Sequence, residues 1–109
     1  MEKNKWMANK IAPLHPTHPG EIIKDEIIFR GISQRQLAIE IGISYTQLNE
    51  LLNGKRPINT QTALLIAKAL DIDAEPLLRL QTRYDIVMSQ RNHLFMARMA
   101  KIRKIATIL

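Results

Sequence analysis

The sequence has no cysteine and no long apolar run, and both absences exclude classes of protein. Without cysteine, the chain cannot hold a disulfide framework or a zinc site with thiolate ligands. The longest apolar stretches are far shorter than the roughly 18 residues that a membrane-spanning helix needs, and no hydrophobic signal segment follows the N-terminal lysines. We therefore expect a cytoplasmic protein without a membrane partner.

Motifs for catalysis and cofactor binding are also missing. Serine, histidine and aspartate all occur, but no nucleophile elbow, Gly-rich phosphate loop or recognisable carboxylate pair accompanies them. His15 and His18 lie in a proline-rich turn with no third ligand at useful spacing, and His93 is remote in the sequence. The sequence thus predicts a protein that is not an enzyme and that has no metal and no cofactor.

Positive charge is concentrated at the two ends of the chain. The 109 residues contain 16 Lys and Arg against 10 Asp and Glu, a formal net charge of +6. Residues 1–11 carry +2, residues 12–88 carry −1 and residues 89–109 carry +5. We expect a flexible basic N-terminal segment (1–12), a folded domain (13–88) and a basic C-terminal helix or tail (89–109). A basic surplus favours an anionic partner, nucleic acid first.

Apolar spacing and capping residues predict an all-α fold of five or six helices, because no run of alternating β-branched residues occurs. Residues 15–20 read as turn or extended chain. The expected helices span residues 21–29, 34–41 and 45–53, and a fourth, capped by Asn59 or Thr60, runs through Leu70. Pro76 suits the first turn of a fifth helix, which either continues toward the C-terminus or breaks near Ser89, where Ser89 would cap a sixth. Ile22 and Phe29 fall on the apolar face of the first helix, and Leu64 falls among the buried residues of the fourth.

Residues 34–53 contain the most informative pattern, a helix, a turn and a second helix. Ala38 is expected where the two helices touch most closely, so that a side chain larger than a methyl group would separate them. Gly42 is expected to turn the chain with a positive φ. The residues that build this motif are Leu37, Ala38, Gly42, Ile43, Leu48 and Leu51.

The second helix of this motif presents polar side chains that can read base edges in DNA. The expected base-reading residues are Ser44, Tyr45, Thr46, Gln47, Asn49 and Glu50. Groups able to grip phosphates flank them. The expected phosphate-binding residues are Gln34, Arg35, Asn53, Lys55 and Arg56. The competing interpretation of the motif is an ordinary helical hairpin whose polar face meets only water. Glu50 has a competing interpretation of its own, in which it pairs with a neighbouring arginine.

With these residues in place, the chain resembles the HigA-type antitoxins within the Xre/Cro (lambda-repressor-like) group of helix-turn-helix regulators, from residue 13 to about 88. The resemblance is carried by His18-Pro-Gly-Glu21, Gly31-Ile-Ser-Gln34, Leu37-Ala38, Gly42-Ile-Ser44, Leu51-Leu-Asn-Gly-Lys-Arg-Pro-Ile58, Thr62-Ala63-Leu64, Ala67-Lys-Ala-Leu70, and Leu80-Gln81 with Tyr84-Asp85. It implies a homodimeric repressor that binds a palindromic double-stranded DNA operator in its own promoter. It also implies neutralisation of a small basic toxin that cleaves mRNA on the ribosome.

Two further surfaces are candidates for partner contacts. An apolar stripe on the C-terminal segment can pair with another helix or pack back on the same domain, and it consists of Phe95, Met99, Ile102, Ala106 and Leu109. An acidic cluster of Glu21, Asp25 and Glu26 either contacts the basic toxin or only complements the dipole of its helix. The rival functions are a stand-alone Xre-type repressor without a toxin and a protein-interaction module that has lost DNA binding.

Overall fold

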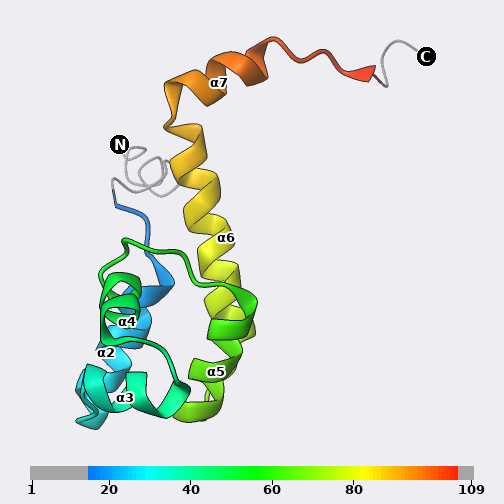
Figure 1. Cartoon of the computed structure of the whole chain (residues 1–109). Coiled ribbons are helices and arrows are strands. Elements are labelled where there is room, and N and C mark those ends of the chain that lie inside the picture. The colour runs from blue at the N-terminus through cyan, green and yellow to red at the C-terminus, as the bar shows by residue number, and fades with distance from the viewer. Residues whose placement is uncertain (1–14, 106–109) are drawn as a thin grey trace, which may run out of the picture.

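Six α-helices and no strand make up residues 15–105, the part of the chain that the computed structural model describes. In chain order they are α2 (Pro19–Arg30), α3 (Gln34–Ile41), α4 (Tyr45–Leu52), α5 (Thr60–Leu70), α6 (Glu75–Gln90) and α7 (His93–Ala100). The predicted all-α class is confirmed. Helices α2 to α5 and the start of α6 form one body, from which the rest of α6 and α7 extend (Figure 1). The predicted segment 1–12, Ala106 and Leu109 lie outside the described residues.

The first described helix starts earlier than the sequence predicts. Residues 15–20 were expected to be turn or extended chain, but α2 begins at Pro19. His18 caps it: His18 Nδ1 accepts from the backbone N–H of Gly20 at 2.9 Å, and the Glu21 carboxylate accepts from the backbone N–H of His18 at 3.3 Å. Proline suits a first helical position because its φ is already helical and it has no N–H left to satisfy.

Local signals place α3 and α4 where they were predicted. Ser33 Oγ accepts from the backbone N–H of Gln36 at 3.0 Å, and Ser44 Oγ accepts from that of Gln47 at 3.0 Å. Each bond satisfies one of the N–H groups that the first helical turn leaves without a partner. Between the two helices Gly42 adopts the left-handed conformation, with φ 75°. The turn that separates the helices therefore forms as expected.

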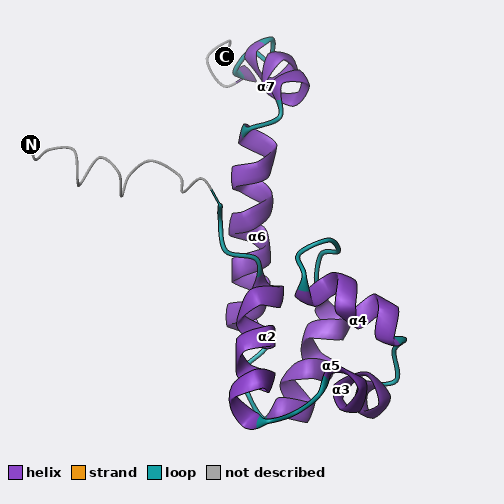
Figure 2. Cartoon of the chain, turned by 90° about the vertical axis from the view of Figure 1, so that its left-hand side faces the viewer, coloured by secondary structure: helices purple, strands orange, loops and turns teal. Residues whose placement is uncertain are grey.

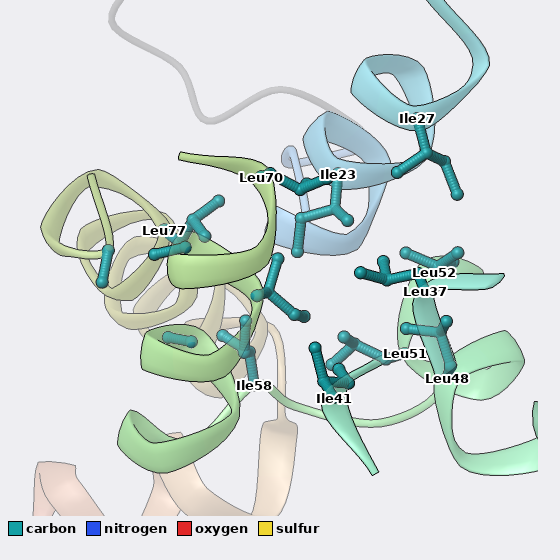
Figure 3. Packing of buried hydrophobic residues seen from close by; sticks show 14 of the residues in the cluster. Ile23, Ile27, Leu37, Ile41, Leu48, Leu51, Leu52, Ile58, Leu70 and Leu77 are labelled. Carbon is teal, nitrogen blue, oxygen red and sulfur yellow. The ribbon is translucent and has the colours of Figure 1, made fainter. Parts of the chain in front are cut away.

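The core lies between α2, α3, α4, α5 and the start of α6 (Figure 3). Ala38 on α3 is buried, and Ile43 in the turn packs against the core while it remains partly exposed. The largest fully buried apolar side chains are Ile23, Ile27, Leu48, Leu51, Leu52, Ile66 and Leu70. Three of these seven belong to α4, so the core fixes which side of that helix faces outward.

Three residues expected on apolar faces are exposed instead. Ile22 is 43%, Phe29 88% and Leu64 56% exposed. In α2, the buried residues Pro19, Gly20, Ile23 and Ile27 recur at spacings of three or four, which leaves Ile22 and Phe29 on the outer side. Leu64 likewise follows Ala63, which is buried, and points away from the core. A helix this short buries one narrow stripe, so the broader faces that were predicted are wrong.

Helix α2 crosses α4 at Gly20 with the two backbones close together. A Cβ atom built on Gly20 would collide with the carbonyl oxygen of Leu51, and it would also crowd the backbone of Leu52. Only glycine leaves room for this approach. The start of α2 is thereby held against the C-terminal end of α4.

The C-terminal helix differs from the prediction in its start and its packing. Helix α6 continues through Ser89 to Gln90, so Ser89 does not cap a new helix. Asn92 caps α7 instead, because its extended backbone lets Oδ1 accept from the N–H of Phe95 at 3.0 Å. No residue of α7 is buried. Figure 2 shows α7 beyond the far end of α6, away from the body, so its apolar side chains do not pack back on the domain.

Candidate nucleic-acid interface

Helix α4 turns its predicted reading side chains toward solvent. Ser44, Tyr45, Thr46 and Gln47 are exposed, while Asn49 and Glu50 are half-buried. This arrangement follows from the three buried leucines on the opposite side of the helix. The first turn of α4 is therefore its most accessible part. Its hydroxyl and amide groups are of the kind that bind base edges in the major groove.

A chain of hydrogen bonds connects Asn49 to two other helices. Asn49 Nδ2 donates to Gln34 Oε1 at 2.9 Å, which joins α4 to α3. Asn53 Nδ2 donates to the carbonyl of Asn49 at 2.9 Å, and Lys24 Nζ on α2 donates to Asn53 Oδ1 at 3.1 Å. Gln34, Asn49 and Asn53 thus lie together, and each already has partners within the protein. Lys24 was not predicted at this surface.

The predicted cations lie near both ends of α4. The guanidinium of Arg35 lies 5.5 Å from the centroid of the Tyr45 ring, within the range of a cation–π contact. Beyond the other end, Lys55 is exposed and Arg56 pairs with Glu50, with 2.7 Å between Arg56 Nη2 and Glu50 Oε1. The pair agrees with the competing interpretation of Glu50. It also holds the Arg56 side chain against the C-terminal half of α4.

The acidic cluster on α2 is partly engaged within the protein. Glu21 accepts from the backbone of His18 and lies 3.1 Å from His15 Nε2. Glu26 pairs with Arg30 at 2.7 Å, four residues later. Asp25 is exposed. The carboxylate of Glu21 therefore has a capping role of its own, whatever else it contacts.

No metal centre is formed by the part of the chain that the structure describes. Residues 15–105 contain no group of three His, Cys, Asp or Glu side chains placed to hold a metal ion. None of the helices in that range is both long and apolar enough to cross a membrane. What α4 and its surroundings offer is hydrogen-bonding groups flanked by cations, the combination that binds base edges and phosphates.

Comparison with known proteins identifies the family of this chain. A helix-turn-helix family model (HTH_3) matches residues 28–77. Virulence-associated protein I of Dichelobacter nodosus is 34% identical over 76 residues, which cover 69% of this chain and 70% of that protein. An addiction module antidote protein of a HigA family from Coxiella burnetii has 33% identity and a TM-score of 0.71, over 84% of this chain and 99% of that one. The chain belongs to the HigA family of helix-turn-helix proteins.

Another HigA structure bears directly on the candidate surface. The Pseudomonas aeruginosa antitoxin HigA was solved with the higBA promoter, and it matches this chain with 25% identity and a TM-score of 0.72 over 83% of this chain and 98% of that one. The helix-turn-helix match includes α3, α4 and α5 in full and reaches into α6. All the residues predicted to read bases or bind phosphates lie inside it.

Proposed function

We propose that this protein is a sequence-specific DNA-binding transcriptional regulator that represses its own promoter. The observation that carries the proposal is the outward face of α4, with Arg35 near its start and Lys55 and Arg56 after its end. The likeness to a HigA solved with its promoter supports it. In this function α4 enters the major groove and the cations bind the adjacent phosphates. The protein acts in the cytoplasm by binding, without catalysis.

The first turn of α4 makes the base contacts in this proposal. Thr46 and Gln47 are exposed and precede the half-buried Asn49 and Glu50. A glutamine amide can donate to and accept from adenine, and the threonine methyl fits the methyl group of thymine. The amide of Asn49 is already bonded to Gln34, so it contributes by holding α4 against α3. Thr46 and Gln47 are thus the leading candidates for direct readout.

A second copy of the chain completes the proposed regulator. A palindromic operator presents two half-sites about one helical turn apart, so two copies must hold their α4 helices at that separation. Phe95, Met99 and Ile102 of the predicted stripe are exposed, and the eight residues of α7 bury none of their side chains. We place the homodimer contact on the exposed apolar side chains of α6 and α7, which a second copy would cover.

The antitoxin role is proposed from the family and from charge. The C. burnetii relative is an addiction module antidote protein. A small basic, mRNA-cleaving toxin would find an acidic partner in the α2 cluster. Asp25 is the cleanest site to test, because Glu21 caps α2 and Glu26 pairs with Arg30. Asp25→Lys should weaken toxin binding without loss of fold, and unchanged toxin affinity would exclude this surface.

Footprinting on the DNA upstream of the protein's own gene tests the proposed function. A protected palindrome is expected, and a mobility-shift assay should show higher affinity for it than for random duplex. Each phosphate that the protein neutralises should contribute about −0.9 to the slope of log affinity against log salt concentration. Equal affinity for random duplex would contradict specific recognition, and no binding would favour an interaction module that has lost DNA binding.

The neighbouring reading frame separates the antitoxin from a stand-alone repressor. If that frame encodes a small basic protein, co-expression and purification should give a complex with this chain. A complex that forms and suppresses the growth defect caused by the basic protein alone supports the antitoxin role. A protected operator without any such complex supports a stand-alone repressor instead.

A further inference from the structure

The loop between α4 and α5 carries Lys55 and Arg56, and its backbone is fixed at successive residues. The N–H of Lys55 donates to the carbonyl of Glu50 at 2.8 Å. Pro57 has no N–H. The N–H of Ile58 donates to a side chain of α6, Gln81 Oε1, at 2.8 Å. Figure 1 shows this loop, in green, running from the end of α4 toward α6 and α5.

His18 fixes the same loop from the start of α2. Its side chain is buried, and Nδ1 accepts from the N–H of Gly20 at 2.9 Å. The ring proton must then lie on Nε2, because a neutral imidazole has one donor and one acceptor nitrogen. The ring also lies against the loop, because a Cβ atom built on Gly54 would be in van der Waals contact with it. With Nδ1 engaged, only Nε2 can donate to the backbone of Arg56, an interaction that raises the pKa of His18 against the larger effect of burial. The ring packs edge-on against Tyr84 of α6, with centroids 4.9 Å apart.

Gln81 is held as firmly as His18. Gln81 is buried, with 7% of its surface exposed, although the residues that follow it on α6, Thr82 and Arg83, are exposed. While Oε1 accepts from Ile58, Nε2 donates to Asp85 Oδ1 at 2.9 Å, one turn further along α6. The second bond fixes which end of the amide faces the loop, because a carboxylate can only accept. The end of the Gln81 amide that faces the loop is therefore the oxygen, which can accept from the N–H of Ile58.

We infer that His18 and Gln81 are positioning residues for DNA binding, which hold the backbone of the loop so that Lys55 and Arg56 meet the phosphates. This inference rests on the proposed function. Neither residue is among those predicted to read bases or bind phosphates, and both lie outside the stretch that the helix-turn-helix model matches. Their effect is to order the loop before DNA arrives, so that binding does not have to order it. A purely structural role would stabilise the fold without changing the number of phosphates neutralised.

Two substitutions of His18 separate these roles. His18→Asn keeps an oxygen that can cap α2 but cannot reach the Arg56 carbonyl, whereas His18→Gln keeps a donor at the position of Nε2 and loses the cap. Affinity is measured on the duplex that footprinting protects, over a range of salt concentrations, with each variant shown to be folded. His18→Asn should bind about tenfold more weakly, and its slope of log affinity against log salt concentration should be less steep by about 0.9. His18→Gln should regain most of both while being the less stable protein.

A double-mutant cycle and a second site make the test decisive. In a background with Lys55→Ala and Arg56→Ala, His18→Asn should produce no further loss of affinity, because the groups it positions are gone. Gln81→Met, which lacks the amide oxygen that accepts from Ile58, should likewise make the slope of log affinity against log salt concentration less steep in the otherwise unaltered protein. Gln81→Met also carries the test if His18→Asn does not fold.

The possible results distinguish this inference from the proposed function. Equal losses in both backgrounds, or an unchanged salt slope in His18→Asn and Gln81→Met, would overturn the positioning role while DNA binding stands. If the unaltered protein does not prefer its own upstream DNA to random duplex, the proposed function fails, and the positioning role fails with it. Salt slopes that are less steep in His18→Asn and Gln81→Met, and that regain their original steepness in His18→Gln, would establish the positioning role.

Discussion

Replacing Gly20 with alanine is expected to destabilise the protein, although the same change stabilises most helices. An added Cβ would meet the carbonyl of Leu51 and the backbone of Leu52, and neither can move without shifting α4. Overpacking of this kind costs about 1–3 kcal/mol. The better helix propensity of alanine returns about 0.5–1 kcal/mol. Because both obstructing groups are backbone, the upper half of the overpacking range applies, about 2–3 kcal/mol, and the free energy of unfolding should fall by roughly 1–2.5 kcal/mol.

Thermal and urea denaturation measure this loss. For a domain of this size the melting temperature should fall by about 5–15 °C, and the urea midpoint should fall with an unchanged m value. Thr17→Ala is the matched control, because Thr17 is exposed just before the cap and its loss should change stability by less than about 0.5 kcal/mol. Truncating Leu51 in addition should not rescue Gly20→Ala, since the clash is with backbone. A Gly20→Ala protein as stable as the original would refute the close approach of α2 and α4.

Three other outcomes follow from the site and the buried histidine. Gln47→Ala should reduce discrimination at a single operator base pair by about 1–3 kcal/mol, which competition with single-base operator variants measures, and a uniform loss over all variants would contradict base readout. Lys55→Ala should weaken binding to specific and random DNA alike and make the salt slope less steep by about 0.9, so an unchanged slope would show that Lys55 does not contact a phosphate. Burial lowers the pKa of His18 from its ordinary value of 6.5, although Glu21 and Asp85 act in the opposite direction. The unfolded chain then binds the proton more tightly, so the free energy of unfolding should decrease as the pH falls below about 6.5. Urea denaturation between about pH 5 and 8 should show this decrease in the original protein and a smaller one in His18→Gln, and equal pH dependence in both would exclude His18 as its source.

The helices that could be predicted from the sequence are those whose signals act over a few residues. Ser33, Ser44 and Asn59 each accept from the N–H three residues further on, so the signal and its effect lie within one turn. The start of α2 could not be predicted in this way. Pro19 and Gly20 read as a break until the backbone of α4 lies beside them, and that contact depends on the packing of the whole domain. The prediction of a helix start at Ser89 was wrong because no glycine or proline ends α6 there, and the helix continues to Gln90.

In the candidate site, too, features set by nearby residues could be predicted and long-range contacts could not. The outward residues of α4 could be predicted because the leucine spacing within eight residues determines which side is buried. The contact between Lys24 and Asn53 spans 29 positions, and that between Gln81 and Ile58 spans 23. No periodicity or capping rule connects residues so far apart. The residues that hold the surface in place are therefore harder to recognise than those that form it.

The ion pair between Glu50 and Arg56 has a consequence for how the regulator searches a genome. A cation that is already neutralised attracts random phosphates less than a free one does, so the protein leaves incorrect sequence sooner. A correct site repays the separation of the pair through the contacts that α4 makes with the bases. Because some 10⁶–10⁹ other positions compete with one operator, the ratio of operator affinity to random-DNA affinity matters more for finding the operator than the affinity alone.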